Sequence, residues 1–487
     1  MSDDLRRTAA GGVAWTASSQ AARQAIQIVV TSILAWNLAP GDFGLIGMAA
    51  VALALTAPLN EMGLSAALVQ RKDLRPGHAV AAFWCQVLVA GLLGAALALA
   101  APLVAGFFHR DEVVPLLRYL CLGLPLGAAA SVPQALLQRR MQFARMAGIE
   151  TASMGVAGAT AVILAFSGYG VWSLVAQSLL GSALSAVLFI AAARFNPLGK
   201  GLPSDLKELF SFGAPLLGYQ ILNFISRNID DILIGRFLGA EPLGYYTMAY
   251  RVMMYPLEKV TGVVGRVTFP AFSSLQEDTQ RLQRGYLRVA QCIALVTFPL
   301  MTIMMIVAPT FARVVFGPQW DAAAPLIAVL SLAGMAASVG TTTGHIFLAR
   351  GRSDLMLRWE IAASACYTAA IVAGLSRGLM GVAVAYTITS LVLWPISHLV
   401  ANRLIDLRLG DFYRVLVPPA ALAGVIGVAL VALRVSWPAP IAAEPAFLAA
   451  ALSVAAVIVA AAAALGRPAA VTEALSLAKE AFRGARG

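Results

Sequence analysis

The feature that most constrains this chain is a run of apolar residues, about 20 long, that recurs from one end of the sequence to the other. A helix of that length crosses roughly 30 Å of hydrocarbon. Hydrophobic residues make up 60% of the 487 residues and charged residues only 12%, whereas a soluble domain is about half apolar and a quarter charged. The chain is therefore predicted to be a polytopic membrane protein, and a water-soluble enzyme is excluded.

Apolar runs bounded by charges, glycine and proline predict fourteen membrane spans. Because lipid offers no partner to an unpaired backbone group, the predicted fold class is all-α. The connections between runs are short, so no inserted soluble domain is expected. The spans are 13–36, 43–64, 79–106, 114–135, 147–166, 170–193, 213–234, 244–268, 289–308, 323–348, 356–374, 379–400, 415–433 and 445–465.

The basic residues indicate an orientation in the membrane. When even-numbered loops and both termini are assigned to the cytoplasm, 24 of the 35 lysines and arginines lie there, five lie on the opposite side and six lie within spans. This asymmetry follows the positive-inside rule. We therefore expect both termini in the cytoplasm and an even number of spans. The net charge of +11 is an orientation signal and does not indicate nucleic-acid binding.

An internal repeat appears when residues 200 positions apart are compared. Five residues of the first half recur at that offset in the second half, and an even number of spans per repeat gives both halves the same orientation. The prediction is a six-helix N-terminal lobe over 1–200, a six-helix C-terminal lobe over 201–410, and two extra helices with a cytoplasmic tail over 411–487. The matched pairs are Gln20 and Gln220, Leu38 and Leu238, Gly44 and Gly244, Met48 and Met248, and Ala49 and Ala249.

Polar side chains follow one helical face in the first two spans of each lobe. Several ionised groups facing lipid would cost on the order of 2.5–3.5 kcal/mol each, so we expect these residues to face a shared, hydrated interior. They are Gln20, Arg23 and Gln27 in span 1, Glu61 at the end of span 2, Gln220, Asn223, Arg227, Asp230 and Asp231 in span 7, and Arg251, Tyr255 and Lys259 in span 8.

Other chemistry is not indicated. No phosphate-binding G-x-x-x-x-G-K-[ST] motif occurs and the histidines are scattered, so neither ATP hydrolysis, an organic cofactor nor a metal site is expected. Tyr245 and Tyr246, near a span end, favour an aromatic belt at the membrane interface.

Four stretches carry a family resemblance: RNIDDILIGRFLGAEPLGYYTMAYRVMMYPLEKV, GLSAALVQRKDL, ALLQRRMQFARMAGIE and GYGVWSLV. They are similar to the polysaccharide flippases of the multidrug/oligosaccharidyl-lipid/polysaccharide (MOP) superfamily, in the branch of colanic-acid-exporter-type and Wzx-type proteins. The resemblance implies a central cavity lined by spans 1, 2, 7 and 8. It also implies alternating access and transfer of polyprenyl-diphosphate-linked oligosaccharide from the inner to the outer leaflet of the bacterial inner membrane.

This resemblance gives the polar residues roles. Arg23, Arg227 and Arg251 are expected to attract the diphosphate, because the guanidinium presents a planar fork of donors. The amides of spans 1 and 7 would then bind sugar hydroxyls. Asp230 is the expected partner of Arg227. Asp231 is a candidate to bind Na⁺ or a proton with Thr387 or Thr389.

Two other functions stay open on the sequence. A cation-coupled small-molecule or multidrug exporter of the same superfamily would need a carboxylate in the first helix, where this chain has Arg23. A membrane glycosyltransferase or polymerase would need a sizeable non-cytoplasmic loop, and the longest such loop spans about 309–322. The favoured prediction is a flippase, which is not an enzyme, with membrane lipids, a polysaccharide polymerase and glycosyltransferases as its expected partners.

Overall fold

The computed structural model describes residues 20, 22–56, 64–70, 75–199, 216–274, 278–437 and 444–465. These residues are helical almost throughout and contain no strand, which confirms the all-α prediction. The chain forms two compact units, the first ending at Gly244 and the second beginning at Tyr245. The predicted division into lobes at residue 200 stays a prediction.

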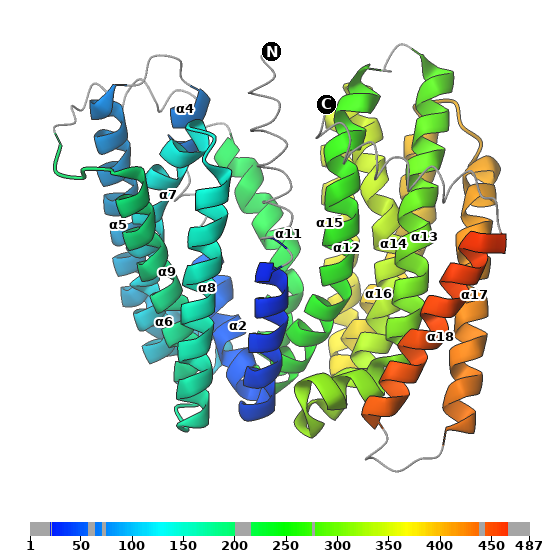
Figure 1. The fold of residues 1–487 in the computed structure, drawn as a ribbon, viewed down its shortest axis with the longest axis horizontal. Helices are drawn as coiled ribbons and strands as arrows, with labels where there is room; N and C mark the ends of the chain where they lie inside the picture. Colours follow the sequence, from blue (N-terminus) through cyan, green and yellow to red (C-terminus); the bar gives the residue numbers. More distant parts are fainter. Residues whose placement is uncertain are drawn as a thin grey trace. The chain divides into compact units, whose positions relative to one another are not determined.

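The first unit is a bundle of helices that follow one another along the chain (Figure 1). Its first helix covers residues 22–37. The helix α7 packs against α5 and α9, and α9 also packs against α8. The others are α2 (Pro40–Ala54), α4 (Leu64–Gln70), α5 (Pro76–Phe108), α6 (Val113–Cys121), α7 (Gly123–Arg139), α8 (Phe143–Phe166), α9 (Trp172–Ala193), α11 (Leu216–Phe237) and the first turn of α12 (Ala240–Ser274).

The second unit contains the rest of α12 and the helices that follow it. The helix α13 lies against α14 and α17, α16 lies against α14 and α15, and α18 packs on α17 and α13. These helices are α13 (Thr279–Phe311), η1 (Ala312–Phe316), η2 (Pro318–Ala323), α14 (Ala324–Ala349), α15 (Ser353–Leu375), α16 (Gly378–Arg403), α17 (Leu409–Ser436) and α18 (Glu444–Leu465).

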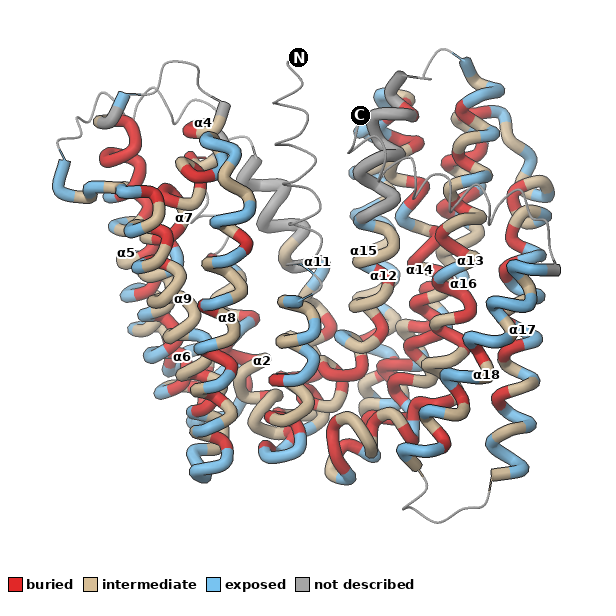
Figure 2. Tube along the Cα trace, viewed as in Figure 1, coloured by how far each residue is buried: buried red, intermediate tan, exposed pale blue. Residues whose placement is uncertain are grey.

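Large apolar side chains cover the outside of the helices. On α5, Leu88, Leu92, Leu99 and Leu103 recur at helical spacing and are 60–81% exposed. Figure 2 shows similar exposed positions along α17 and α18. A soluble protein rarely exposes such long apolar stripes. They are the surface that lipid covers, so the chain is a multi-pass membrane protein.

Ten of the described helical segments are long and apolar enough to cross a membrane, and they correspond to predicted spans 3–6 and 9–14. The other four predicted spans fall on residues 22–37, α2, α11 and α12. Charged residues interrupt the last two, with Arg227 and Asp230 on α11 and Arg251 and Lys259 on α12. In the part of the chain that the structure describes, α11 and α12 therefore differ from these ten segments in polarity.

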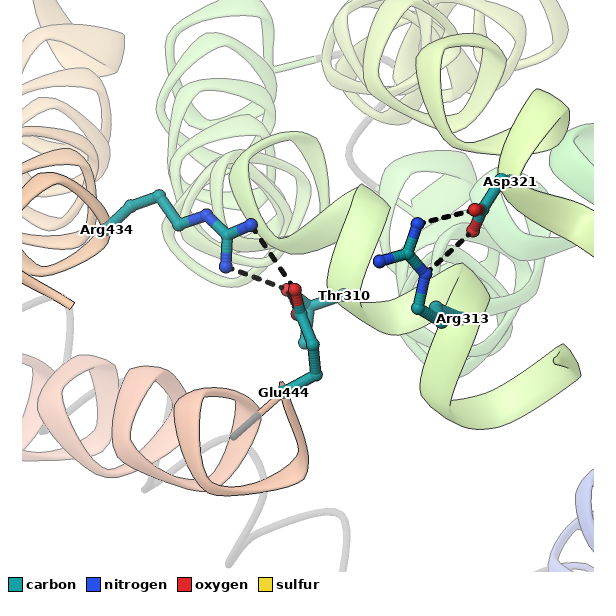
Figure 3. A network of polar contacts seen from close by, with 5 residues as sticks. All are labelled: Thr310, Arg313, Asp321, Arg434 and Glu444. Atoms are coloured by element: carbon teal, nitrogen blue, oxygen red, sulfur yellow. Dashed lines mark hydrogen bonds and ion pairs between the residues drawn. The ribbon is translucent and has the colours of Figure 1, made fainter. Parts of the chain in front are cut away.

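Polar contacts join α17 and α18 to α13 within the second unit (Figure 3). The Arg434 guanidinium of α17 lies 3.4 Å from Glu444 of α18 and 4.8 Å from the ring centroid of Phe447. The Thr310 hydroxyl of α13 donates to the same carboxylate. One acidic side chain thus joins three helices.

The predicted loop over 309–322 is ordered secondary structure. It forms the π-helical turn η1 and the 3₁₀ turn η2, and an ion pair between Arg313 and Asp321 spans the two turns. Trp320 of η2 is fully buried. This segment is part of the packed second unit.

The belt prediction for Tyr246 is wrong. Its side chain is 0% exposed and stacks on Tyr250 at 5.9 Å between ring centroids. Tyr245 is half-buried and donates a hydrogen bond to the backbone carbonyl of Gln319 at 3.2 Å. Tyr245 also packs edge-on against Trp320, and such tertiary contacts are not revealed by the local sequence.

Candidate functional site

The polar face of the first helix is present in the structure. Arg23 donates to the side-chain oxygen of Gln20 at 2.7 Å, and Gln27 donates to the Thr31 hydroxyl at 3.3 Å. The spacing of three and four residues places these side chains in one line along the helix. Arg23 and Gln27 both line a pocket of about 550 Å³ in the first unit.

The charge of Arg23 is compensated by a residue that the sequence did not single out. Its guanidinium forms an ion pair with Glu150 of α8, and the two side chains are 17% and 30% exposed. The other carboxylate oxygen of Glu150 accepts a hydrogen bond from Gln134 of α7 at 3.1 Å. A charge among apolar helices is tolerated when it is paired and hydrogen-bonded. Three helices therefore meet at this carboxylate.

Two helices supply most of the pocket wall, each with one face of small or polar residues. The face of α8 comprises Glu150, Ser153, Met154 and Ala157, at offsets of three, four and seven. The face of α9 comprises Ser178, Gly181, Ser182 and Ser185, at the same offsets, beside Gln177. Residues at this spacing lie on one side of a helix. The lining is thus rich in hydroxyl and amide groups.

Small residues make room for the pocket. Gly181 of α9 faces Ala157 of α8. A Cβ added at Gly181 would lie 3.6 Å from the Cβ of Ala157, which is van der Waals contact, so the two helices are close together at this point. A Cβ added at Gly127 of α7, which also lines the pocket, would meet no atom within 4 Å. The space beside α7 is consequently open to a ligand.

One hydroxyl in this wall is unsatisfied. Ser153 is 2% exposed, and its Oγ has no hydrogen-bond partner among the residues that the structure describes. A buried polar atom without a partner costs about 1–3 kcal/mol. Ser153 is one of the residues that line the pocket.

The predicted residues of span 7 lie on α11. Asp230 is buried, and its carboxylate accepts a hydrogen bond from the backbone N–H of Asp231 at 3.0 Å. Arg227 is exposed and Asp231 half-buried. The side chains of Gln220 and Asn223 lie outside the described residues, as does Glu61. The pairing of Asp230 with Arg227 stays a prediction.

The predicted residues of span 8 lie on α12, in the second unit. Arg251 is exposed. The Lys259 ammonium lies 5.7 Å from the ring centroid of Tyr255, a cation–π contact. Thr387, the expected hydroxyl of a coupling site, is buried and donates to the backbone carbonyl of Val329 at 3.2 Å. Ion coupling remains an expectation.

Among the described residues, no group of three or more histidine, cysteine or acidic side chains could hold a metal ion. The site that the structure brings together is the pocket of Arg23, Gln27 and Glu150. The sequence does contain two features that could have indicated the α8 and α9 wall of this pocket. One is the single carboxylate in the apolar run 147–166, and the other is the set of serines at helical spacing in the run 170–193.

A family model and two relatives that match this chain are all described as biosynthesis proteins, of polysaccharide, teichuronic acid and lipopolysaccharide respectively. The family model described as "Polysaccharide biosynthesis protein" matches residues 33–325. Teichuronic acid biosynthesis protein TuaB of Bacillus subtilis (strain 168) is 31% identical over 420 residues, which cover 86% of this chain and 87% of the relative. Lipopolysaccharide biosynthesis protein WzxC of Escherichia coli (strain K12) is 27% identical over 420 residues, covering 84% and 83%.

Solved structures share the fold. A structure of the lipid II flippase MurJ in an inward closed conformation matches with a TM-score of 0.68 and 12% identity, covering 91% of this chain and 97% of that one. An inward-facing multidrug resistance MATE family transporter of the MOP superfamily matches with a TM-score of 0.54 and 16% identity, covering 79% and 94%. At these identities the likeness is one of fold.

Proposed function

Because the chain belongs to the polysaccharide biosynthesis protein family, we propose that it moves a polyprenyl-diphosphate-linked oligosaccharide from the inner to the outer leaflet of a bacterial inner membrane. The observation that carries the proposal is a pocket of about 550 Å³, lined by several serine and glutamine side chains, in a bundle that exposes large apolar side chains. A passage for a sugar needs such a lining, whereas the polyprenyl tail can stay in lipid. No covalent bond changes in this step.

The proposed mechanism is alternating access. The saccharide would enter a hydrated interior from the cytoplasmic side and leave it on the periplasmic side, while the helices shield it from hydrocarbon. Arg227 and Arg251, both exposed on the polar helices α11 and α12, would attract the diphosphate. Asp231 is proposed to bind Na⁺ or a proton. Removal of the product by a polymerase, with saccharide supplied by glycosyltransferases, would give net direction.

A multidrug exporter of the same fold is the second candidate. It is favoured by Glu150, a carboxylate in the pocket of the first unit that could attract a cation. Arg23 already neutralises this carboxylate. A hydroxyl-rich pocket whose charges cancel suits a saccharide better than a cationic drug.

Reconstitution tests the function. Purified protein would be placed in vesicles with lipid-linked saccharide extracted from host cells that lack the gene, and periodate oxidation would measure the saccharide exposed outside. We expect the wild-type protein to move it between leaflets. Arg23→Ala, which leaves Glu150 without its cation, should slow transfer about tenfold or more.

Arg145→Ala is the control, because Arg145 is exposed at the start of α8 and donates only to the adjacent Gln142 side chain in the part of the chain described. It should transfer at the wild-type rate. If deletion cells accumulate no lipid-linked saccharide, or if the wild-type protein leaves the saccharide on its original leaflet, the proposed function is wrong.

A further inference from the structure

The charges of the pocket in the first unit cancel. Arg23 and Glu150 are its charged lining residues, and they are bound to each other. Arg23 also donates to Gln20, and Glu150 also accepts from Gln134. A diphosphate bound at Arg23 would have to displace the carboxylate and leave it half-buried without a cation, which is unfavourable. The pocket is therefore poorly suited to an anion.

The remaining polar groups match a polyol. Gln27, Ser178, Ser182 and Ser185 carry amide or hydroxyl groups, which both donate and accept. The hydroxyls of a sugar ring also do both. A fully ionised phosphate can only accept hydrogen bonds, whereas a sugar hydroxyl can both donate hydrogen bonds to these side chains and accept hydrogen bonds from them.

We propose that this pocket, between the first helix and α7, α8 and α9, is a saccharide subsite that binds the glycan and not the diphosphate. The inference rests on the proposed function and names which part of the substrate the pocket takes. It reassigns Arg23 from a diphosphate ligand to a positioning residue, which holds Glu150 as a hydrogen-bond acceptor for sugar hydroxyls.

Two independent observations support a ligand here. The first is Ser153, a residue that lines the pocket, is 2% exposed and has an Oγ without a partner among the described residues. Buried polar groups are normally satisfied, so an unsatisfied one in a cavity wall indicates a bound polar group. The second is size, because about 550 Å³ falls within the roughly 300–1,000 Å³ of small-molecule sites.

The test compares two ligands. Binding to the purified protein would be measured for bare polyprenyl diphosphate and for the lipid-linked saccharide from deletion cells. Gly127→Phe places a ring in the open space beside α7. This variant should bind the lipid-linked saccharide at least about tenfold more weakly than the wild type does, with an affinity equal to that for bare polyprenyl diphosphate. Its affinity for bare polyprenyl diphosphate should be unchanged.

Gly148→Phe is the matched control. Gly148 lies on α8, is exposed and also has open space around its Cβ position, but it does not line the pocket. It should bind both ligands as the wild type does. A second variant, Ser153→Ala, removes only the unsatisfied hydroxyl, so it should fold normally and weaken saccharide binding about two- to tenfold.

The outcomes separate the subsite from the function. Equal loss of both ligands in Gly127→Phe would place the diphosphate in this pocket and overturn the proposal. So would unchanged saccharide binding in both Gly127→Phe and Ser153→Ala while the wild type discriminates between the ligands. If the wild type bound neither ligand, the proposed function itself would fail.

Discussion

Arg23 shows how much a single residue can be understood from sequence. Its place on a polar helical face predicted that it would avoid lipid and line a hydrated space, and it does line a pocket. Its partner could not be predicted. Glu150 lies on a helix whose other residues are largely apolar, and nothing in local periodicity says which helix α8 will face. Only tertiary packing brings the two charges together.

The ion pair should therefore contribute to stability. Glu150→Gln leaves the partly buried Arg23 guanidinium without its counter-charge, so we expect a loss of about 1–3 kcal/mol in the free energy of unfolding. The double variant Arg23→Gln with Glu150→Gln should lose less than the sum of the single variants. Thermal unfolding of the purified variants in detergent measures both, and the difference from additivity is the coupling energy.

The exposed pair of Arg352 and Asp354 provides the comparison. These side chains are 45% and 48% exposed, with the two atoms 2.9 Å apart. Arg352→Gln should change stability by less than about 1 kcal/mol, because solvent screens an exposed pair. Equal effects of Glu150→Gln and Arg352→Gln would show that the pair in the pocket contributes no more than an exposed one.

At the scale of elements, the repeat found in the sequence explains a close helix crossing. A Cβ added at Gly44 of α2 would lie 1.7 Å from the backbone oxygen of Ala240, and one added at Gly244 would lie 1.9 Å from that of Pro40. The two glycines are one of the pairs that recur 200 residues apart. The first turns of α2 and α12 thus touch backbone to backbone through equivalent positions.

The sequence predicted the equivalence of these glycines but not their contact. A repeat relates two positions without saying whether they touch. The same limit applies to α11, which the repeat assigned to the second lobe and which packs against α2 and α5 of the first unit. Element identity follows from local hydropathy, whereas the neighbours of an element depend on side chains distant in sequence.

The crossing predicts a strong requirement for glycine. Gly44→Ala and Gly244→Ala each place a methyl group inside another residue's backbone, so the helices must separate, at an expected loss of about 1–3 kcal/mol. Gly41→Ala is the control on α2, since its Cβ would meet no atom within 4 Å. It should be neutral or stabilise by up to about 1 kcal/mol, because alanine favours a helix. Thermal unfolding in detergent compares the three, and similar midpoints for all of them would contradict the crossing.

For the whole molecule, the distribution of charge predicts which ends of the helices face the cytoplasm. Each described unit offers a helix with a basic end and a less basic end. In the first unit α8 begins after Arg139 and Arg140 and ends before Gly168, and in the second α15 begins after Arg350 and Arg352 and ends before Arg377. Both helices have spanning length, so their two ends lie on opposite sides of the membrane. The positive-inside rule puts the more basic end in the cytoplasm.

Reporter fusions test this orientation in both units independently. Alkaline phosphatase, which is active only in the periplasm, should be active when joined after Gly168 or Ser376 and silent when joined after Met141 or Gly351. A cytoplasm-active fluorescent protein at the same four junctions should give the complementary pattern and so exclude poor expression as the cause of silence. Because one helix separates the junctions of each pair, the pattern must alternate in each unit. Alternation in one unit with the opposite sign in the other would mean that the two repeats run in opposite directions through the membrane, and the parallel two-lobe arrangement deduced from the repeat would then be wrong.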